Sequence, residues 1–147
     1  MSSTIRPIAI GIFRRHDEIL VGFAHDVFKG ERYCRPPGGA IEFGERAAAT
    51  LRREMLEEVH AEIAEPSLIG VLENTFLLEG VPKHELIFVF EAAFENAQLY
   101  DKPAIPLYEA GWEGSLKWVP LSQFRDGSLP LYPDGLLALL DSAAPTM

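Results

Sequence analysis

The chain lacks several features that would point to other classes of protein. Only one of its 147 residues is a cysteine, Cys34, which excludes an intramolecular disulfide and favours a reducing compartment. No apolar run reaches the roughly 18 residues that a membrane-spanning helix needs. The N-terminal residues 1–7 show no signal-peptide pattern. We therefore expect a cytoplasmic protein that does not insert into a membrane.

Positive charge is also scarce. The chain has 13 Lys and Arg against 22 Asp and Glu, which gives a net charge of −9. A protein that binds the nucleic-acid backbone would carry a basic stripe, so no nucleic-acid partner is expected. The same acidity would repel a phosphate substrate, so metal ions and a few local cations would have to neutralise such a site. The length and the 48% hydrophobic content predict one domain, residues 1–147.

The hydrophobic pattern predicts several strands and two helices. We expect strands over 8–13, 19–24, 68–78, 85–94 and 116–119, and helices over 45–59 and 133–140. Residues 25–35 are polar and mixed and are predicted as a loop. Residues 98–114, interrupted by prolines and glycines, are predicted as the longest irregular stretch. A helix between strands, then more strands and a terminal helix, predicts an α/β sandwich with a mixed sheet.

The first predicted helix carries a dense carboxylate cluster. Glu54, Glu57 and Glu58 are spaced i, i+3, i+4 and stack beside an apolar face. Like charges at this spacing destabilise a helix by about 0.2–0.5 kcal/mol per pair, and a divalent cation with oxygen ligands would offset the repulsion. The alternative is a solvated acidic face paired with the neighbouring arginines. The three glutamates alone leave both interpretations open.

A glycine turn precedes the cluster at a characteristic spacing. The chain has Gly, five residues, Glu, seven residues, Arg-Glu, an aliphatic residue, any residue and Glu-Glu. The matched positions are Gly39, Glu45, Arg53, Glu54, Met55, Glu57 and Glu58. At roughly 6–7% usage of each residue type, a chance match arises about once in ten million start points. The stretch resembles the Nudix box, and Pro36-Pro37-Gly38-Gly39 and Lys117-Trp118-Val119-Pro120-Leu121 resemble an entry turn and a late strand of that family.

The resemblance implies a fold and a cofactor. The fold would be a Nudix-type α/β/α sandwich with a mixed β-sheet, and the cofactor Mg²⁺ or Mn²⁺. The implied metal ligands are the carbonyl of Gly38 and the carboxylates of Glu54, Glu57 and Glu58. Arg53 and Glu45 would pair and orient these ligands. Dimers are common in the family, so a homodimer is possible, and the sequence leaves the oligomeric state open.

The identity of the catalytic base stays open at this stage. In the family the role varies between glutamates of the box, here Glu54 and Glu57, and a glutamate outside it. Glu113 is the candidate outside the box, because it precedes the 116–119 strand, where some relatives place a catalytic acid. Glu109 competes with it, and a solvated loop glutamate is the alternative for both.

One position departs from the family pattern. His60 stands where the family has a glycine that closes the helix. That glycine favours a left-handed C-terminal turn, in which His is tolerated better than most side chains. Ala61 is a weak match to the aliphatic position that follows. We expect a modest local cost in stability and no effect on the implied ligands.

The candidates for substrate binding are less specific. Arg35, just before the glycine turn, could bind a phosphate in a bidentate manner through two of its guanidinium nitrogens, and Arg32 less directly. Phe28, Phe76 and Trp112 could stack on a base. The alternatives are ordinary surface charges for the arginines and core packing for Phe76.

The expected function follows from the intact box. It is divalent-metal-dependent hydrolysis of a phosphoanhydride bond in a nucleoside diphosphate linked to another moiety, such as a nucleoside triphosphate, dinucleotide or nucleotide sugar. The alternative is a non-catalytic, nucleotide-binding regulatory Nudix-like domain, which loss of the glutamates would favour. Isomerisation of an isoprenoid diphosphate is a third possibility, for which the chain offers no paired Cys and Glu. The sequence marks of two substrate subclasses are absent, so the substrate stays open.

Overall fold

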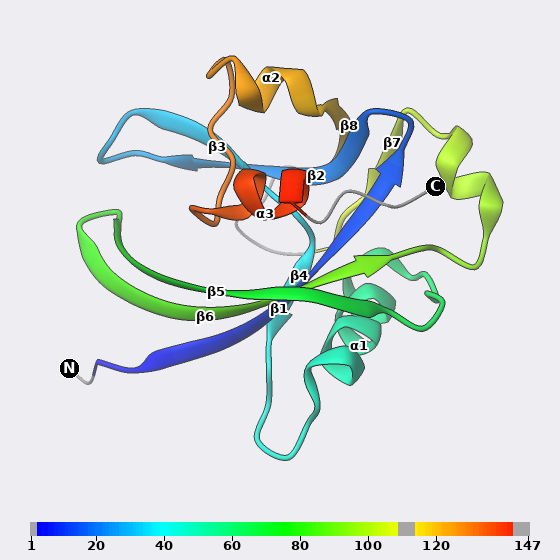
Figure 1. Cartoon of the computed structure of the whole chain (residues 1–147), viewed down its shortest axis with the longest axis horizontal. Coiled ribbons are helices and arrows are strands. Elements are labelled where there is room, and N and C mark those ends of the chain that lie inside the picture. Colours follow the sequence, from blue (N-terminus) through cyan, green and yellow to red (C-terminus); the bar gives the residue numbers. More distant parts are fainter. Residues whose placement is uncertain (1–2, 109–113, 143–147) are drawn as a thin grey trace.

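A mixed β-sheet forms the centre of the computed structural model, which describes residues 3–108 and 114–142 (Figure 1). The strands are β1 (Ile5–Arg15), β2 (Glu18–Asp26), β3 (Glu31–Arg35), β4 (Gly38–Ala40), β5 (Ser67–Leu78), β6 (Val81–Ala92), β7 (Ala104–Pro106) and β8 (Ser115–Pro120). The helices are α1 (Ala47–Val59), the 3₁₀ helix η1 (Ala97–Asp101), α2 (Leu121–Arg125) and α3 (Leu136–Ser142). The strand order is β5-β6-β1-β2-β8-β7, with β3 on β2 and β4 on β1.

Strand β1 is the centre of this sheet because both of its faces are apolar. It pairs in parallel with β6 and antiparallel with β2 and β4, which makes the sheet mixed. Side chains alternate along a strand, so Ile8, Ile10 and Ile12 enter one core cluster while Ala9 and Phe13 enter the other. The apolar run at residues 86–90, within the predicted strand 85–94, lies in β6 and pairs with β1 through its whole length.

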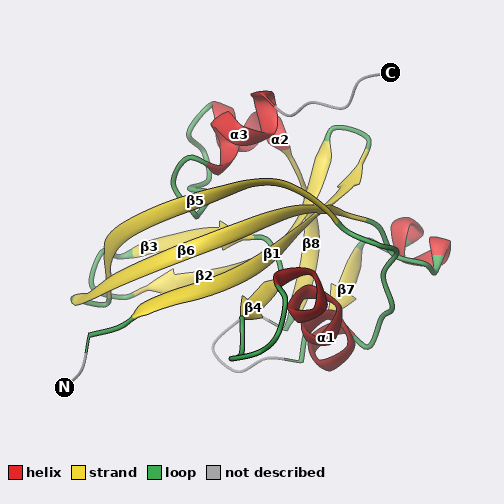
Figure 2. Ribbon diagram, turned by 60° about the horizontal axis from the view of Figure 1, so that its bottom comes forward, coloured by secondary structure: helices red, strands yellow, loops and turns green. Residues whose placement is uncertain are grey.

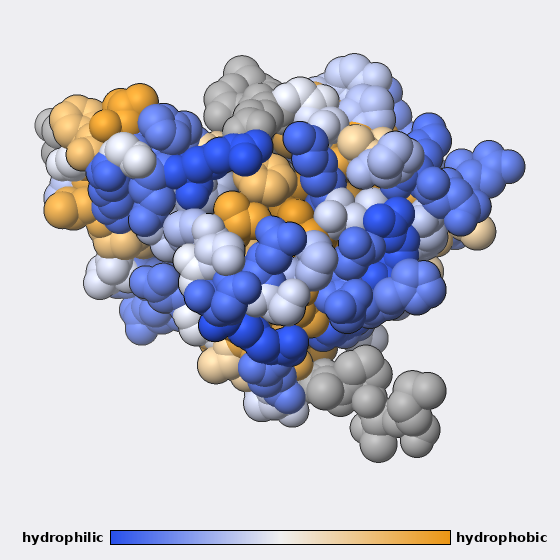
Figure 3. All heavy atoms as spheres, turned by 90° about the horizontal axis from the view of Figure 1, so that it is seen from above, coloured by the Kyte–Doolittle hydropathy of each residue, from blue (hydrophilic) through white to orange (hydrophobic). Residues whose placement is uncertain are grey.

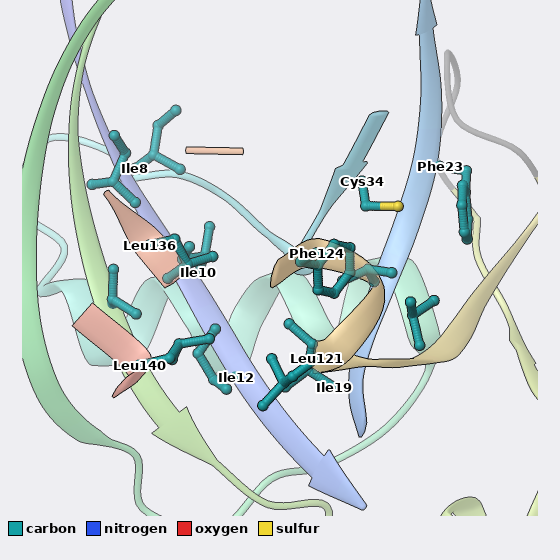
Figure 4. Packing of buried hydrophobic residues seen from close by; sticks show 14 residues of the cluster. Ile8, Ile10, Ile12, Ile19, Phe23, Cys34, Leu121, Phe124, Leu136 and Leu140 are labelled. Atoms are coloured by element: carbon teal, nitrogen blue, oxygen red, sulfur yellow. The ribbon is translucent and has the colours of Figure 1, made fainter. Parts of the chain in front are cut away.

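Helices cover both faces of the sheet. Figure 2 shows α1 on one side, with α2 and α3 on the other. Leu136 and Leu140 of α3 lie beside the β1 isoleucines in the first cluster (Figure 4). On the opposite face, Leu51 and Met55 of α1 are fully buried in the second cluster. The predicted α/β/α sandwich is therefore confirmed.

Several boundaries predicted from the sequence are wrong. Residues 25–35 are not all loop, since β3 pairs with β2, and residues 98–114 contain part of η1 and all of β7. These strands are short, and β3 is polar, so pairing with neighbours defines them rather than their own hydrophobic pattern. Helix α1 begins at Ala47 rather than at residue 45, and α3 begins at Leu136 rather than at residue 133.

The surface is largely polar on one side. The face in Figure 3 is mainly hydrophilic, with apolar groups between the hydrophilic ones and at one end. Within residues 3–108 and 114–142, no helix has the length and apolar character that crossing a bilayer requires.

Candidate active site

The glycine turn leads from β3 into β4, where the chain comes very close to β1. Gly38 has a φ of 154°, and a Cβ built on it would lie 2.0 Å from the carbonyl oxygen of Ala9. A Cβ on Gly39 would lie 2.3 Å from the Cδ atom of Glu54. Neither position has room for a side chain, so both glycines are required by contacts that are distant in sequence. The turn therefore lets helix α1 pack against the centre of the sheet.

Helix α1 presents the box residues in very different environments. Glu58 is 7% exposed and is buried with Met55 and Val59. The side chain of Glu54 is 12% exposed and rests on Gly39, whereas that of Glu57 is 57% exposed. The three carboxylates lie on neighbouring positions of the helix, as predicted, but only Glu57 is open to solvent.

Arg53 connects the helix to the two segments that precede it. Its Nε donates to Oε2 of Glu45 at 2.8 Å, and its Nη2 donates to the carbonyl of Ala40 at 3.1 Å. Its Nη1 donates to Glu54 at 3.1 Å and to Glu57 at 3.2 Å. One guanidinium thus holds β4, the loop before α1 and two box carboxylates in a fixed relation.

Glu45 is the strongest partner of Arg53. It lies before α1 rather than within it, and it also accepts a 2.6 Å hydrogen bond from the Thr50 hydroxyl. The hydrogen bonds from Arg53 and then from Thr50 lower the pKa of Glu45 from 4.5 to about 2. Glu45 in turn raises the pKa of Arg53 above its already high value. Both groups therefore stay charged at any physiological pH.

The fit of a metal ion to these residues can be judged from their chemistry and packing. All the implied donors are oxygens, the type that Mg²⁺ prefers, and the absence of a side chain at Gly39 leaves room for the Glu54 carboxylate itself. Among the residues that the structure describes, no group of three His, Cys, Asp or Glu side chains is arranged to hold a metal. Arg53 Nη1 instead lies within hydrogen-bonding distance of Glu54 and Glu57. The donors therefore fit a hard cation in kind, while Arg53 sets the present positions of two of them.

A cavity of about 320 Å³ adjoins the glycine turn, within the size range of small-molecule sites. Gly38, Gly39 and Glu58 line one part of it. The remaining charged lining consists of Arg6, Arg35, Lys83, Glu79 and Glu85, with His25. Counting Glu58, three cations face three carboxylates, so the described lining has no net charge when His25 is neutral. A polyphosphate would therefore need additional positive charge to bind tightly.

The predicted substrate-binding residues are only partly brought together. Arg35 lines the cavity, and its Nη2 donates to Glu85 at 2.9 Å. Arg32 stacks its guanidinium over Phe23, with 4.0 Å between the carbon and the ring centroid. Phe28 is 73% exposed and lies near Gly80. Neither Arg32 nor Phe28 belongs to the described lining of the cavity.

Glu85 was not predicted as a site residue, yet it is 3% exposed and shares the cavity with Arg6 and Arg35. A signal for it exists: Glu85 has the same parity as the buried Ile87 and Val89 of β6, which predicts an inward side chain. Buried carboxylates are normally paired, and here both arginines supply the partners. Arg6 and Lys83 carried no comparable signal, because each is one of many charged residues near a strand end.

The candidates Glu109, Trp112 and Glu113 lie outside the described residues. The chain on either side of them is tied to the end of α1 and to itself. The amide of Tyr108 donates to the carbonyl of Glu58 at 2.8 Å. The amide of Leu107 donates to the carbonyl of Gly114 at 3.1 Å.

The C-terminal end of α1 has the left-handed turn predicted for His60, the position that departs from the family pattern. His60 adopts the left-handed conformation, with φ 58° and ψ 37°, and its amide donates to the carbonyl of Met55. Its ring stacks on that of Tyr108, with 4.2 Å between centroids and 6° between planes. The stack is an interaction that a glycine could not make.

A mixed sheet between helices, with a glycine turn and an acidic helix beside a cavity, is the architecture of one class of hydrolase. The model of the NUDIX domain matches residues 4–139, and the chain therefore belongs to the NUDIX family. It is a Nudix pyrophosphohydrolase. No curated protein gave a significant match.

Solved structures share this fold. A NUDIX hydrolase from Nitrosomonas europaea has a TM-score of 0.69 and 18% identity, over 94% of this chain and 87% of the other. A MutT NUDIX hydrolase from Burkholderia pseudomallei has a TM-score of 0.67 and 21% identity, over 93% and 97%. A MutT protein from Bacillus halodurans has a TM-score of 0.59 and 23% identity, over 91% and 79%. At these identities the likeness shows the fold, and the substrate must be argued from the site itself.

Proposed function

We propose that this enzyme uses Mg²⁺ or Mn²⁺ to hydrolyse a phosphoanhydride bond in a nucleoside diphosphate linked to another moiety. Nucleoside triphosphates, dinucleotides and nucleotide sugars all belong to this substrate class. The observation that carries the proposal is the meeting of the glycine turn, Glu54 and Glu58 beside a cavity that also holds arginines. A metal site and a phosphate site would then share one wall.

The cation would be held by the Gly38 carbonyl and by Glu54, Glu57 and Glu58. When bound, a divalent cation neutralises phosphate charge and makes a coordinated water more acidic. The balanced charges of the described cavity lining support this requirement, because the protein alone supplies no excess of positive charge there. Arg53 would orient Glu54 and Glu57, with Glu45 holding the guanidinium in place.

The remaining roles concern the phosphates and the proton. Arg35 would bind a phosphate oxygen from the cavity wall, while Glu85 fixes its guanidinium. The general base stays open between the box glutamates Glu54 and Glu57 and a glutamate outside the box, for which we propose Glu113, with Glu109 as its competitor. To separate the two loop candidates, the pH–rate profiles of Glu113→Gln and Glu109→Gln are measured and compared. The variant that has lost the general base should no longer show the fall in rate at low pH that protonation of the base causes.

A cytoplasmic location is also part of the proposal. It rests on the single cysteine, Cys34, which is buried and suits a reducing compartment. We further propose a homodimer as the form to test, by light scattering during gel filtration.

The decisive experiment measures phosphate and pyrophosphate release from a panel of nucleotides and nucleotide conjugates. Each compound is tested with Mg²⁺, with Mn²⁺ and with EDTA. We expect metal-dependent turnover of one compound class and none in EDTA. Absence of turnover across the panel, together with tight binding of one member, would instead indicate the regulatory module.

A further inference from the structure

Strand β5 has a neighbouring strand on one side only. It pairs with β6 and ends the strand order of the sheet, at the outer edge in Figure 2. Among the described residues, no other segment forms a backbone hydrogen bond with this outer edge. Proteins usually block such an edge with proline, lysine or a bulge, because it can pair with another chain. Strand β5 has neither proline nor lysine, and its register shift lies between Leu68 and Gly70, so residues 71–78 remain a regular open edge.

The turn after β5 determines which of its backbone groups point outward. Leu78 and Val81 flank Glu79 and Gly80, which have positive φ values of 50° and 78°, so the turn is of type I′. The two flanking residues bond to each other, and bonding residues alternate along an antiparallel pair. The even-numbered residues of β5 from 72 to 78 therefore bond to β6. The amides and carbonyls that point away from the sheet are those of residues 71, 73, 75 and 77.

These four residues also form a stripe of exposed side chains. Alternate side chains of a strand point to opposite faces, and Leu72 packs in the cluster that contains α3, so the stripe lies on the other face. Val71 is 49% exposed and Leu77 is 53% exposed, with the exposed Glu73 and Thr75 between them. The apolar residues stand at the two ends and the polar residues in the middle. Because antiparallel pairing reverses a strand, this pattern is complementary to itself.

A twofold axis at Asn74 matches the stripe with that of a second copy. Outward-pointing residues must lie opposite each other for the strands to bond, so the axis has to pass through a residue of β5. At Asn74, the axis places Val71 opposite the partner's Leu77, which pairs the apolar ends. It also places Glu73 opposite the partner's Thr75, whose hydroxyl can donate to the carboxylate.

The neighbouring axes fit less well because of Glu73. An axis at residue 73 places this carboxylate opposite the partner's Glu73, and an axis at residue 76 places it opposite the partner's Glu79. Like charges directly opposite each other are destabilising. Axes at residues 72 and 75 set Glu73 against the partner's Val71 and the partner's Leu77, which cannot bond to it. Between residues 72 and 76, the axis at residue 74 therefore avoids both defects.

The charge of the chain also favours this edge for self-association. The net charge is −9, so two copies repel each other in general. Strand β5 carries a single charged residue, Glu73, and its Oε2 lies 2.9 Å from Nε2 of His84 in the same copy. Electrostatic repulsion between two copies is therefore small along this strand.

The other face of β5 meets the candidate active site. Asn74 and Phe76 line a cavity of about 100 Å³, which shares Arg35 and Glu85 with the larger cavity. At the proposed axis, Asn74 would lie beside the partner's Asn74, and each of the two amides can donate to and accept from the other. A second copy paired at this edge would therefore border the small cavity.

We propose that β5 is the interface of a homodimer in which the sheets of two copies join edge to edge. The strands pair antiparallel through residues 71–77, with the twofold axis at Asn74. The inference rests on the homodimer of the proposed function, for which it names the surface, and it is independent of the hydrolytic activity. The occupant is a second copy because the stripe of β5 complements itself after reversal.

Sedimentation velocity over a wide range of protein concentration tests the surface. The wild type should form a dimer. Leu77→Lys places an ammonium group opposite the partner's Val71 and should raise the dimer Kd about tenfold or more, since the pair occurs twice across a twofold axis. Thr75→Pro removes an outward amide that only the partner needs, so it should abolish the dimer and keep the fold. Leu68→Lys is the matched control, because Leu68 is also 53% exposed but lies beyond the register shift.

A disulfide tests the register. Two residues on the axis form a pair without hydrogen bonds, with Cα atoms about 4.5 Å apart, which a disulfide can bridge. Asn74→Cys should therefore give a covalent dimer under mild oxidation, seen on a non-reducing gel. Phe76→Cys is the control, because it would lie opposite the partner's Leu72 and away from its own counterpart. The native Cys34 is buried and common to both variants.

The outcomes separate the surface from the other proposals. A dimer that persists in Leu77→Lys and Thr75→Pro overturns the β5 interface and leaves the homodimer standing. A wild type that stays monomeric at every concentration overturns both, whereas turnover of the nucleotide panel is decided separately. Equal crosslinking of Asn74→Cys and Phe76→Cys overturns the axis at Asn74. Unfolding midpoints establish that each variant is folded.

Discussion

Gly39 and Glu54 are packed so closely that the carboxylate of Glu54 occupies the space where a Cβ of residue 39 would stand. The first residue of the Nudix box thus makes room for a carboxylate fifteen positions later. Arg53 reinforces the arrangement by bonding both Glu54 and the carbonyl of Ala40. The glycine is required by the position of a charged group and not only by the turn.

Gly39→Ala should therefore displace Glu54 and lower turnover. We expect a loss of about 10²-fold, since a shift near 1 Å in a positioned group can cost that much, and a loss of unfolding free energy of about 1–3 kcal/mol from overpacking. Steady-state kinetics and denaturant unfolding measure the two effects. Gly114→Ala is the control for the unfolding free energy, because its Cβ would meet open space and its φ lies outside the left-handed region. An active Gly39→Ala enzyme would contradict the placement of Glu54 in the metal site.

Removing one carboxylate charge should separate activity from stability. Glu57→Gln or Glu58→Gln should lower turnover by about 10²-fold or more, because each removes a proposed metal ligand. For Glu57→Gln the fold should change by less than about 1 kcal/mol, since a weak exposed pair with Arg53 is lost while carboxylate repulsion is relieved. Mg²⁺ titrations of activity measure the first effect. Unchanged turnover in both variants would remove the metal-site assignment.

The Glu45–Arg53 pair should make stability depend on pH in the acid range. The pKa of Glu45 is about 2 in the folded protein against 4.5 as its ordinary value, so the unfolded chain binds more protons between these values. The stabilising contribution is therefore complete above pH 4.5 and is lost as pH falls through about 2. Glu45→Gln should be less stable than the wild type at pH 6, and the difference should shrink toward pH 2.

Urea unfolding across this pH range measures that difference. Glu42→Gln is the matched control, because the Glu42 carboxylate is exposed and its oxygen lies 3.9 Å from Arg53. Its effect should be small and nearly constant with pH. A constant difference for Glu45→Gln as well would show that the ion pair with Arg53 does not set the pKa of Glu45.

His60→Gly should leave turnover within a few-fold and stability nearly unchanged. Glycine removes the cost of a non-glycine residue in the left-handed region, about 1–2 kcal/mol, but loses the ring stack with Tyr108, about 0.5–1.5 kcal/mol. His60→Ala loses the stack and keeps the backbone cost, so it should be the less stable variant by thermal unfolding. A large loss of turnover in His60→Gly would show that the helix end contributes directly to the reaction.

Spacing patterns explain why much of the fold and part of the site could be predicted. The strand cores of β1, β2, β5, β6 and β8 and the helix α1 follow from hydrophobic periodicity within each segment. The left-handed turn at His60 follows from its position at the end of the box helix. By contrast, β3 and β7 could not be predicted, because their strand character comes from partners elsewhere in the chain.

By itself the sequence determined the family and the carboxylates of the box, because the box is a local spacing that a single helix displays on one face. Only the tertiary structure decided what surrounds those carboxylates. It placed Glu85 between Arg6 and Arg35, put Arg35 on the wall shared by two cavities, and left Arg32 and Phe28 outside the described linings. These relations join β1, β3 and β6, and strand pairing fixes them over distances along the chain that no local pattern records.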